Sequence, residues 1–150
     1  SEELVFRGYL QQQLAARYSS RWVWWVLPAL LFGLAHFDGE STGVNAWLVV
    51  ADTFLIGLIA GDLTARTGNL GAAVGLHLAN NTAALLVMAT EGTITGLSLF
   101  VTPFAITDAR AMRSMLLADL VVALVLYTMY LFIMALRQRR RLQSSERNLI

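Results

Sequence analysis

The chain has no cysteine, no lysine and few charged residues of either sign. The absence of cysteine excludes a disulfide framework, a cysteine nucleophile and a zinc site built from thiolates. Only 14% of the 150 residues are charged, whereas a soluble domain carries roughly 25%. The net charge of +1 argues against a nucleic-acid partner, because a nucleic-acid binder presents a broad basic face.

Several common catalytic signatures are also missing. No glycine-rich phosphate loop follows a strand pattern, no serine occupies a nucleophile elbow, and His-Glu-x-x-His does not occur. The chain begins with serine and shows no signal peptide, so we interpret it as the C-terminal part of a longer protein. Its length predicts one domain over residues 1–150. We divide that domain into a motif region at 1–90, accessory helices at 91–142 and a polar tail at 143–150.

Apolar residues dominate the composition of the chain. They make up 57% of the chain, and the mean hydropathy is +0.59. After a mixed helix at residues 1–18, the apolar residues gather in four stretches: 22–37, 46–60, 70–89 and 114–136. Stretches near 20 apolar residues are about long enough to cross a bilayer. We therefore predict an all-α fold, a polytopic transmembrane bundle of about four spans plus an N-terminal motif helix.

The arginines suggest an orientation in the membrane. The tail at 137–141 is arginine-rich, and cytoplasmic loops of membrane proteins are enriched in basic residues. If the tail is cytoplasmic, the alternation of spans places three more arginines on that side: Arg17, Arg21 and Arg66. Arg110 and Arg113 do not fit this scheme. We expect an integral membrane protein in contact with lipid, in a bacterial cytoplasmic membrane, with its C-terminal tail in the cytoplasm.

The first polar cluster lies at the start of the chain. Glu3 and Arg7 are four residues apart with the acid first, which favours an ion pair along one helix face. Glu2 lies about 100° further round the helix. It is therefore free to act as a general base toward water. The alternative is a solvated helix start whose acids favour the N-terminal end of the helix dipole.

The only two histidines of the chain both lie in apolar stretches. His36 follows Phe32 by one helical turn, and its alternative role is that of an interfacial or hydrogen-bonded residue. His77 and Asn81 share a helix face. An imidazole and a carboxamide so placed can stabilise a carbonyl oxygen as it becomes an oxyanion. The alternative is hydrogen bonding between helices, worth under about 1 kcal/mol per contact.

Two further acids, Asp52 and Asp119, interrupt apolar stretches. Ionisable groups inside a membrane are costly and usually mark a contact or a proton pathway. We favour the structural contact over the proton relay for both acids. Gly57 and Gly61 form a small-residue pair of the kind that lets helix backbones approach closely.

The three clusters, in this order, resemble the CPBP family of intramembrane proteases. This is the CAAX-protease and bacteriocin-processing group, also called Abi proteins, and it includes the type II CAAX prenyl endopeptidases. The matching segments cover roughly residues 1–90 and read EELVFR at 2–7, FGLAH at 32–36 and HLANN at 77–81. Each motif is weak alone, whereas three in order on apolar helices are specific.

The resemblance implies an endopeptidase that hydrolyses a peptide bond in or near the membrane. Glu2 would activate the attacking water, and His36 would bind or polarise it. His77 and Asn81 would form the oxyanion hole. The substrate would be a peptide or protein, lipidated if the host prenylates its proteins. No cofactor would be required.

The resemblance also implies that Glu3 and Arg7 order the site. A competing mechanism places zinc on Glu2, His36 and His77, because a catalytic zinc takes three protein ligands and one water. Two other functions remain open at this point. One is a non-catalytic membrane scaffold or immunity protein of the same family. The other is a proton-coupled transporter with a relay through three residues: Glu2, His36 and Asp52.

Overall fold

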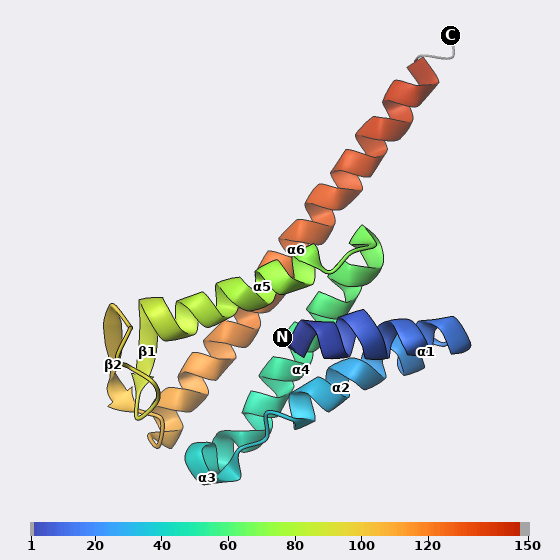
Figure 1. Cartoon of the computed structure of the whole chain (residues 1–150). Helices are drawn as coiled ribbons and strands as arrows, with labels where there is room; N and C mark the ends of the chain where they lie inside the picture. The colour runs from blue at the N-terminus through green and yellow to red at the C-terminus, as the bar shows by residue number, and fades with distance from the viewer. Residues whose placement is uncertain (1, 148–150) are drawn as a thin grey trace.

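The structure is a computed structural model that describes residues 2–147, with side chains up to residue 140, and it is mostly helical (Figure 1). The elements follow in this order: η1 (Leu4–Leu10), α1 (Gln11–Arg17), η2 (Trp22–Val26), α2 (Leu27–Leu34), α3 (Gly39–Thr42), η3 (Gly43–Asn45), α4 (Ala46–Thr67), α5 (Gly71–Thr82), η4 (Ala83–Val87), β1 (Met88–Glu91), β2 (Phe100–Ala105) and α6 (Ala109–Arg147). Of the predicted polar tail, residues 143–147 continue α6, and residues 148–150 lie outside the described part.

Two helices are long and apolar enough to cross a membrane. They are Gly39–Thr67, of 29 residues, and Ala109–Arg140, of 32 residues. The other two predicted spans form shorter apolar helices, Trp22–Leu34 and Gly71–Val87. At 1.5 Å per residue these reach roughly 20 and 26 Å, less than the hydrocarbon core of about 30 Å. Two of the four predicted spans are therefore long enough to cross a membrane, and the other two are shorter.

The prediction of an all-α fold was wrong between residues 88 and 105. Part of the stretch expected to hold accessory helices forms a parallel pair of short strands, β1 and β2, with Met88 opposite Phe100. Residues 93–105 are rich in β-branched and aromatic residues, which favour strands. Pro103 also disfavours a helix here, because proline has no amide hydrogen to donate. Proline is tolerated in β2 because a two-stranded sheet consists of edge strands alone.

Glycines bring α2 and α4 together at the centre of the molecule. A Cβ atom added at Gly33 would lie 2.8 Å from a backbone oxygen of α4, and one at Gly57 would lie 3.2 Å from the Cα atom of Ala29. A Cβ atom at Gly61 would lie 2.8 Å from the Trp25 ring. The close approach of helix backbones is thus confirmed at Gly57, whereas Gly61 makes room for a side chain.

Helix α6 packs much less tightly. Only 6% of its most apolar stretch is buried, against 39% for the span that contains α4. Polar contacts hold α6 near the two ends of α4. Asn45 donates to the Ala109 carbonyl over 2.8 Å, and the Tyr127 hydroxyl donates to Asp62 over 2.7 Å. Figure 1 shows α6 extending past the rest of the fold.

Candidate active site

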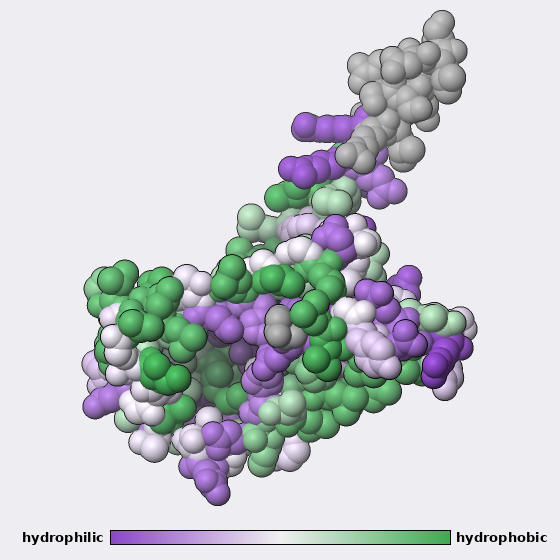
Figure 2. Space-filling view, viewed as in Figure 1, coloured by the Kyte–Doolittle hydropathy of each residue, from purple (hydrophilic) through white to green (hydrophobic). Residues whose placement is uncertain are grey.

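The three sequence motifs meet around one cavity of about 460 Å³. The residues that line it are Glu2, His36, Val74, His77, Leu78 and Asn81. In Figure 2 a hydrophilic surface lies between the start of the chain and α5, framed by apolar surface. His36 follows the end of α2 and His77 lies within α5, yet both face this cavity. The structure therefore brings together the four residues to which catalytic roles were assigned.

Glu3 joins two cationic or hydrogen-donating side chains. Its Oε1 atom accepts from Arg7 Nη1 over 3.0 Å and lies 2.9 Å from His77 Nδ1. Glu3 is only 2% exposed. A carboxylate oxygen can only accept, so the Nδ1 atom of His77 carries the proton in this contact. The Nε2 atom of His77 lies 3.6 Å from Glu2 Oε2, at the edge of the cavity.

The contact between Glu3 and His77 was missed by the sequence analysis, which paired Glu3 with Arg7 alone. The two residues are 74 positions apart, so no helical periodicity connects them. The signal that could have suggested it is the rarity of both groups in an apolar chain, since buried polar groups usually find partners.

A second set of contacts fixes the motif helix against α4. Arg7 Nη2 donates to the carbonyl of Gly57 over 3.1 Å, and Gln11 Nε2 donates to that of Gly61 over 3.0 Å. Arg7 is 2% exposed, and its Cζ atom lies 4.5 Å from the centre of the Phe32 ring. That distance is within the range of a cation–π interaction. Phe32, which marked the second motif without an assigned role, is therefore the platform under Arg7.

The tautomer of His36 follows from its local hydrogen bond. Its Nδ1 atom lies 2.8 Å from the carbonyl oxygen of Phe32, which can only accept. The Nδ1 atom therefore carries the hydrogen, and Nε2 of a neutral ring keeps its lone pair. The ring packs against Phe32 with 4.6 Å between ring centres. His36 can thus accept a hydrogen bond from a water molecule in the cavity.

Glu2, His36 and His77 have the donor types that zinc prefers, but their arrangement does not suit a metal. Within residues 2–147, no three histidine or acidic side chains are grouped so that they could hold an ion. No catalytic step is therefore assigned to a metal.

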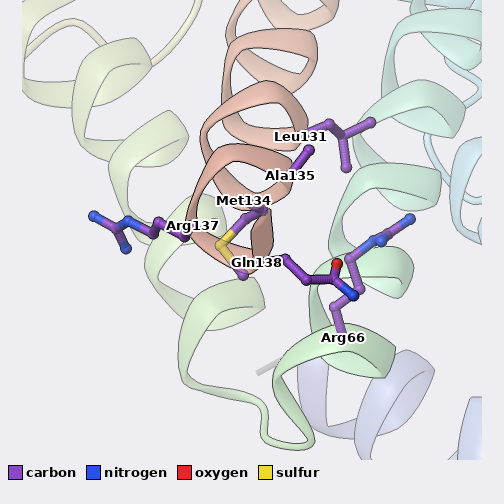
Figure 3. Close-up of a pocket in the computed structure, with 6 residues that line it drawn as sticks. All are labelled: Arg66, Leu131, Met134, Ala135, Arg137 and Gln138. Atoms are coloured by element: carbon purple, nitrogen blue, oxygen red, sulfur yellow. The ribbon is translucent and has the colours of Figure 1, made fainter. Parts of the chain in front are cut away.

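A larger cavity, of about 580 Å³, lies between the end of α4 and α6 (Figure 3). Its lining residues are Arg66, Leu131, Met134, Ala135, Arg137 and Gln138. They include no carboxylate and no imidazole, and the side chains of Arg66 and Arg137 point to opposite sides of the view in Figure 3. The smaller cavity is therefore the one equipped for acid–base chemistry.

Comparisons with known proteins support the same part of the chain. A family model described as "Type II CAAX prenyl endopeptidase Rce1-like" matches residues 1–83, which contain all three motifs. An "Uncharacterized 24.3 kDa protein" from Escherichia coli is 33% identical over 87 residues. That alignment covers 57% of this chain and 38% of the relative, so the chain spans well under half of the relative's length. No solved structure matches the chain.

Proposed function

The chain belongs to the Rce1-like family of type II CAAX prenyl endopeptidases, and from this membership we propose that it is an intramembrane endopeptidase. It hydrolyses a peptide bond by attack of an activated water through a tetrahedral intermediate. One observation carries the proposal. Glu2, His36, His77 and Asn81, which come from three separate segments, all face one cavity.

Glu2 is the general base. Its side chain is 52% exposed, so it can reach a water molecule in the cavity, whereas Glu3 is buried and already engaged. Glu2 takes one proton from the water, and the Nε2 lone pair of His36 accepts a hydrogen bond from the other hydrogen. The protonated Glu2 then gives its proton to the departing amine. A positioned acid–base group of this kind contributes about 10²- to 10⁴-fold in rate.

His77 and Asn81 form the oxyanion hole. His77 donates through Nδ1 to Glu3, so it must be an imidazolium to donate also through Nε2 to the oxyanion. Each ring nitrogen of His77 has a carboxylate beside it, Glu3 at Nδ1 and Glu2 at Nε2. Asn81 lies one turn further along α5 and faces the same cavity. Each oxyanion donor is worth roughly 2.7–4 kcal/mol of barrier lowering.

Glu3 and Arg7 position these groups without touching the substrate. Glu3 fixes the ring of His77, and Arg7 anchors Glu3 to α4 through the Gly57 carbonyl. The substrate is a peptide or protein reached from the membrane, because α4 and α6 are long and apolar enough to span it. A lipidated substrate fits a host that prenylates proteins.

The experiment is a comparison of membrane-fraction N-termini by mass spectrometry. Cells carry the full-length protein, Glu2→Gln, or Glu40→Gln as a matched control whose exposed acid lies outside the cavity. New N-termini should appear with the wild type and the control and vanish with Glu2→Gln at equal protein level. Identical N-termini in all three strains, with the biological phenotype retained, would contradict the proposal and favour a non-catalytic scaffold.

A further inference from the structure

A second pair of acids lies outside the motifs, between the two candidate spans. Asp52 lies within the Gly39–Thr67 span and Asp119 within the Ala109–Arg140 span. Two hydrogen bonds between these spans, Asn45 with Ala109 and Tyr127 with Asp62, occur in the same order along both helices. The two helices therefore run parallel, and Asp52 and Asp119 lie between these two contacts along the chain.

Asp52 lacks the partners that a buried acid needs. It is 8% exposed, and its Oδ1 atom is buried without a hydrogen-bond partner in the described part of the chain. Its carboxyl group is within hydrogen-bonding reach of that of Asp119. Two ionised carboxylates are both acceptors and cannot form this bond. Like charges so close together in an apolar setting also repel each other strongly.

No described cation compensates this pair. Helix α2, which packs against α4, has no charged residue. In η1 and α5, the side chains that can carry a positive charge are Arg7 and His77, and both contact Glu3. On α6, Arg113 precedes Asp119 by six residues, which is roughly 9 Å along the helix. At the other end of the interface, Arg66 and Tyr127 both contact Asp62.

We propose that Asp52 and Asp119 together bind one proton, which their two carboxyl groups share. The shared proton supplies the missing donor and removes one of two charges from an apolar interface, where charge is costly. It thereby holds α6, which has little other packing, against α4. The site is independent of the catalytic cavity and of the proposed proteolysis.

The first test detects the proton directly by infrared spectroscopy of the full-length protein in lipid. A protonated carboxyl group gives a carbonyl band that a carboxylate lacks. This band should be lost in Asp52→Asn and in Asp119→Asn, because an amide then supplies the donor and the remaining acid ionises. Asp108→Asn is the matched control, since Asp108 is an exposed acid that caps the start of α6. A band unchanged in both amide variants would overturn the proposal.

The second test follows the docking of α6. The chain has no cysteine, so spin labels can be placed at Ala65→Cys and Gln138→Cys, near the ends of the two spans. The distance distribution should be narrow at low pH and broaden as the proton is lost at high pH. With Asp119→Asn it should stay narrow throughout. A wild type insensitive to pH, or an Asp119→Asn variant that broadens equally, would contradict the proposal.

Two further measurements distinguish loss of the proton from other causes of a broader distance distribution. Tyr127→Phe removes the neighbouring contact to Asp62 and should loosen α6 equally at every pH. Replacing N-methylglucamine by sodium at high pH should leave the wild-type distribution broad. If sodium narrows it, the site binds a metal cation and the assignment of a proton is wrong.

Discussion

Two buried carboxyl groups in this molecule, those of Glu3 and Asp52, have opposite surroundings. Glu3 is 2% exposed and Asp52 is 8% exposed, and each has one oxygen without a partner in the described residues. The other oxygen of Glu3 faces Arg7 and His77, whereas Asp52 faces another acid. Burial alone therefore does not define the role of an acid. The charge of its neighbours decides whether it fixes a cation or binds a proton.

The largest difference should appear in activity. Glu2→Gln removes the general base of the catalytic cavity, beside Glu3, and should lower the rate of cleavage by about 10²- to 10⁴-fold. Asp52→Asn alters the other acid pair and should leave cleavage close to that of the wild type, because that pair lies outside the cavity. The measurement is hydrolysis of a substrate identified by the N-terminal comparison. Equal losses in both variants would abolish the distinction between the two pairs.

Removing a neighbour should affect stability differently at the two acids. Arg7→Met leaves the buried Glu3 carboxylate without its ion-pair partner and should lower the free energy of unfolding by about 3–5 kcal/mol. Asp119→Asn gives Asp52 a hydrogen-bond donor and should leave stability at neutral pH unchanged or higher. Unfolding by denaturant in lipid micelles measures both. Arg66→Met is the control, because that more exposed ion pair is worth about 0–1 kcal/mol. A stability loss for Arg7→Met no larger than the control would contradict the anchoring role.

Two adjacent asparagines on α5 sharpen the comparison. Asn81 faces the catalytic cavity, and Asn80 lines a groove that also contains Asp119. Asn81→Ala should lower kcat by about 10²- to 10³-fold, through loss of an oxyanion donor. Asn80→Ala should leave kcat near the wild-type value. Steady-state kinetics on both variants tests this, and the reverse pattern would mean that the wrong face of α5 was assigned.

The smallest effect is expected from metal removal. Because no described trio of side chains is arranged to hold an ion, activity after dialysis against a chelator should equal that before it. The measurement is the cleavage rate, with metal content checked by elemental analysis. Loss of activity that zinc restores would show that Glu2, His36 and His77 rearrange into a metal site.

Much of this organisation was visible in the sequence. The pair Glu3 and Arg7 and the pair His77 and Asn81 follow from the four-residue period of a helix, and the apolar stretches follow from composition. The family resemblance is confirmed by the match over residues 1–83. The close approach at Gly57 follows from residue size, because a small residue is needed wherever helix backbones meet.

The remaining features depend on contacts between distant segments. Nothing local connects Glu3 with His77 or Asp52 with Asp119, since each pair forms only when separate helices pack together. The strand pair at residues 88–105 was missed for a related reason. Short strands are stabilised by a partner strand more than by their own sequence, so context decides their conformation.

Phe32 places an unusual restriction on how this protein can evolve. The centre of its ring lies 4.5 Å from the Arg7 guanidinium carbon, 4.6 Å from the His36 ring centre and 6.2 Å from the His77 ring centre. A leucine would fill similar space but would offer no aromatic face to the cation. A tyrosine would keep the face but bring a hydroxyl into a position that is 4% exposed. A library of all substitutions at position 32 should therefore retain few functional variants, although the residue itself performs no chemistry.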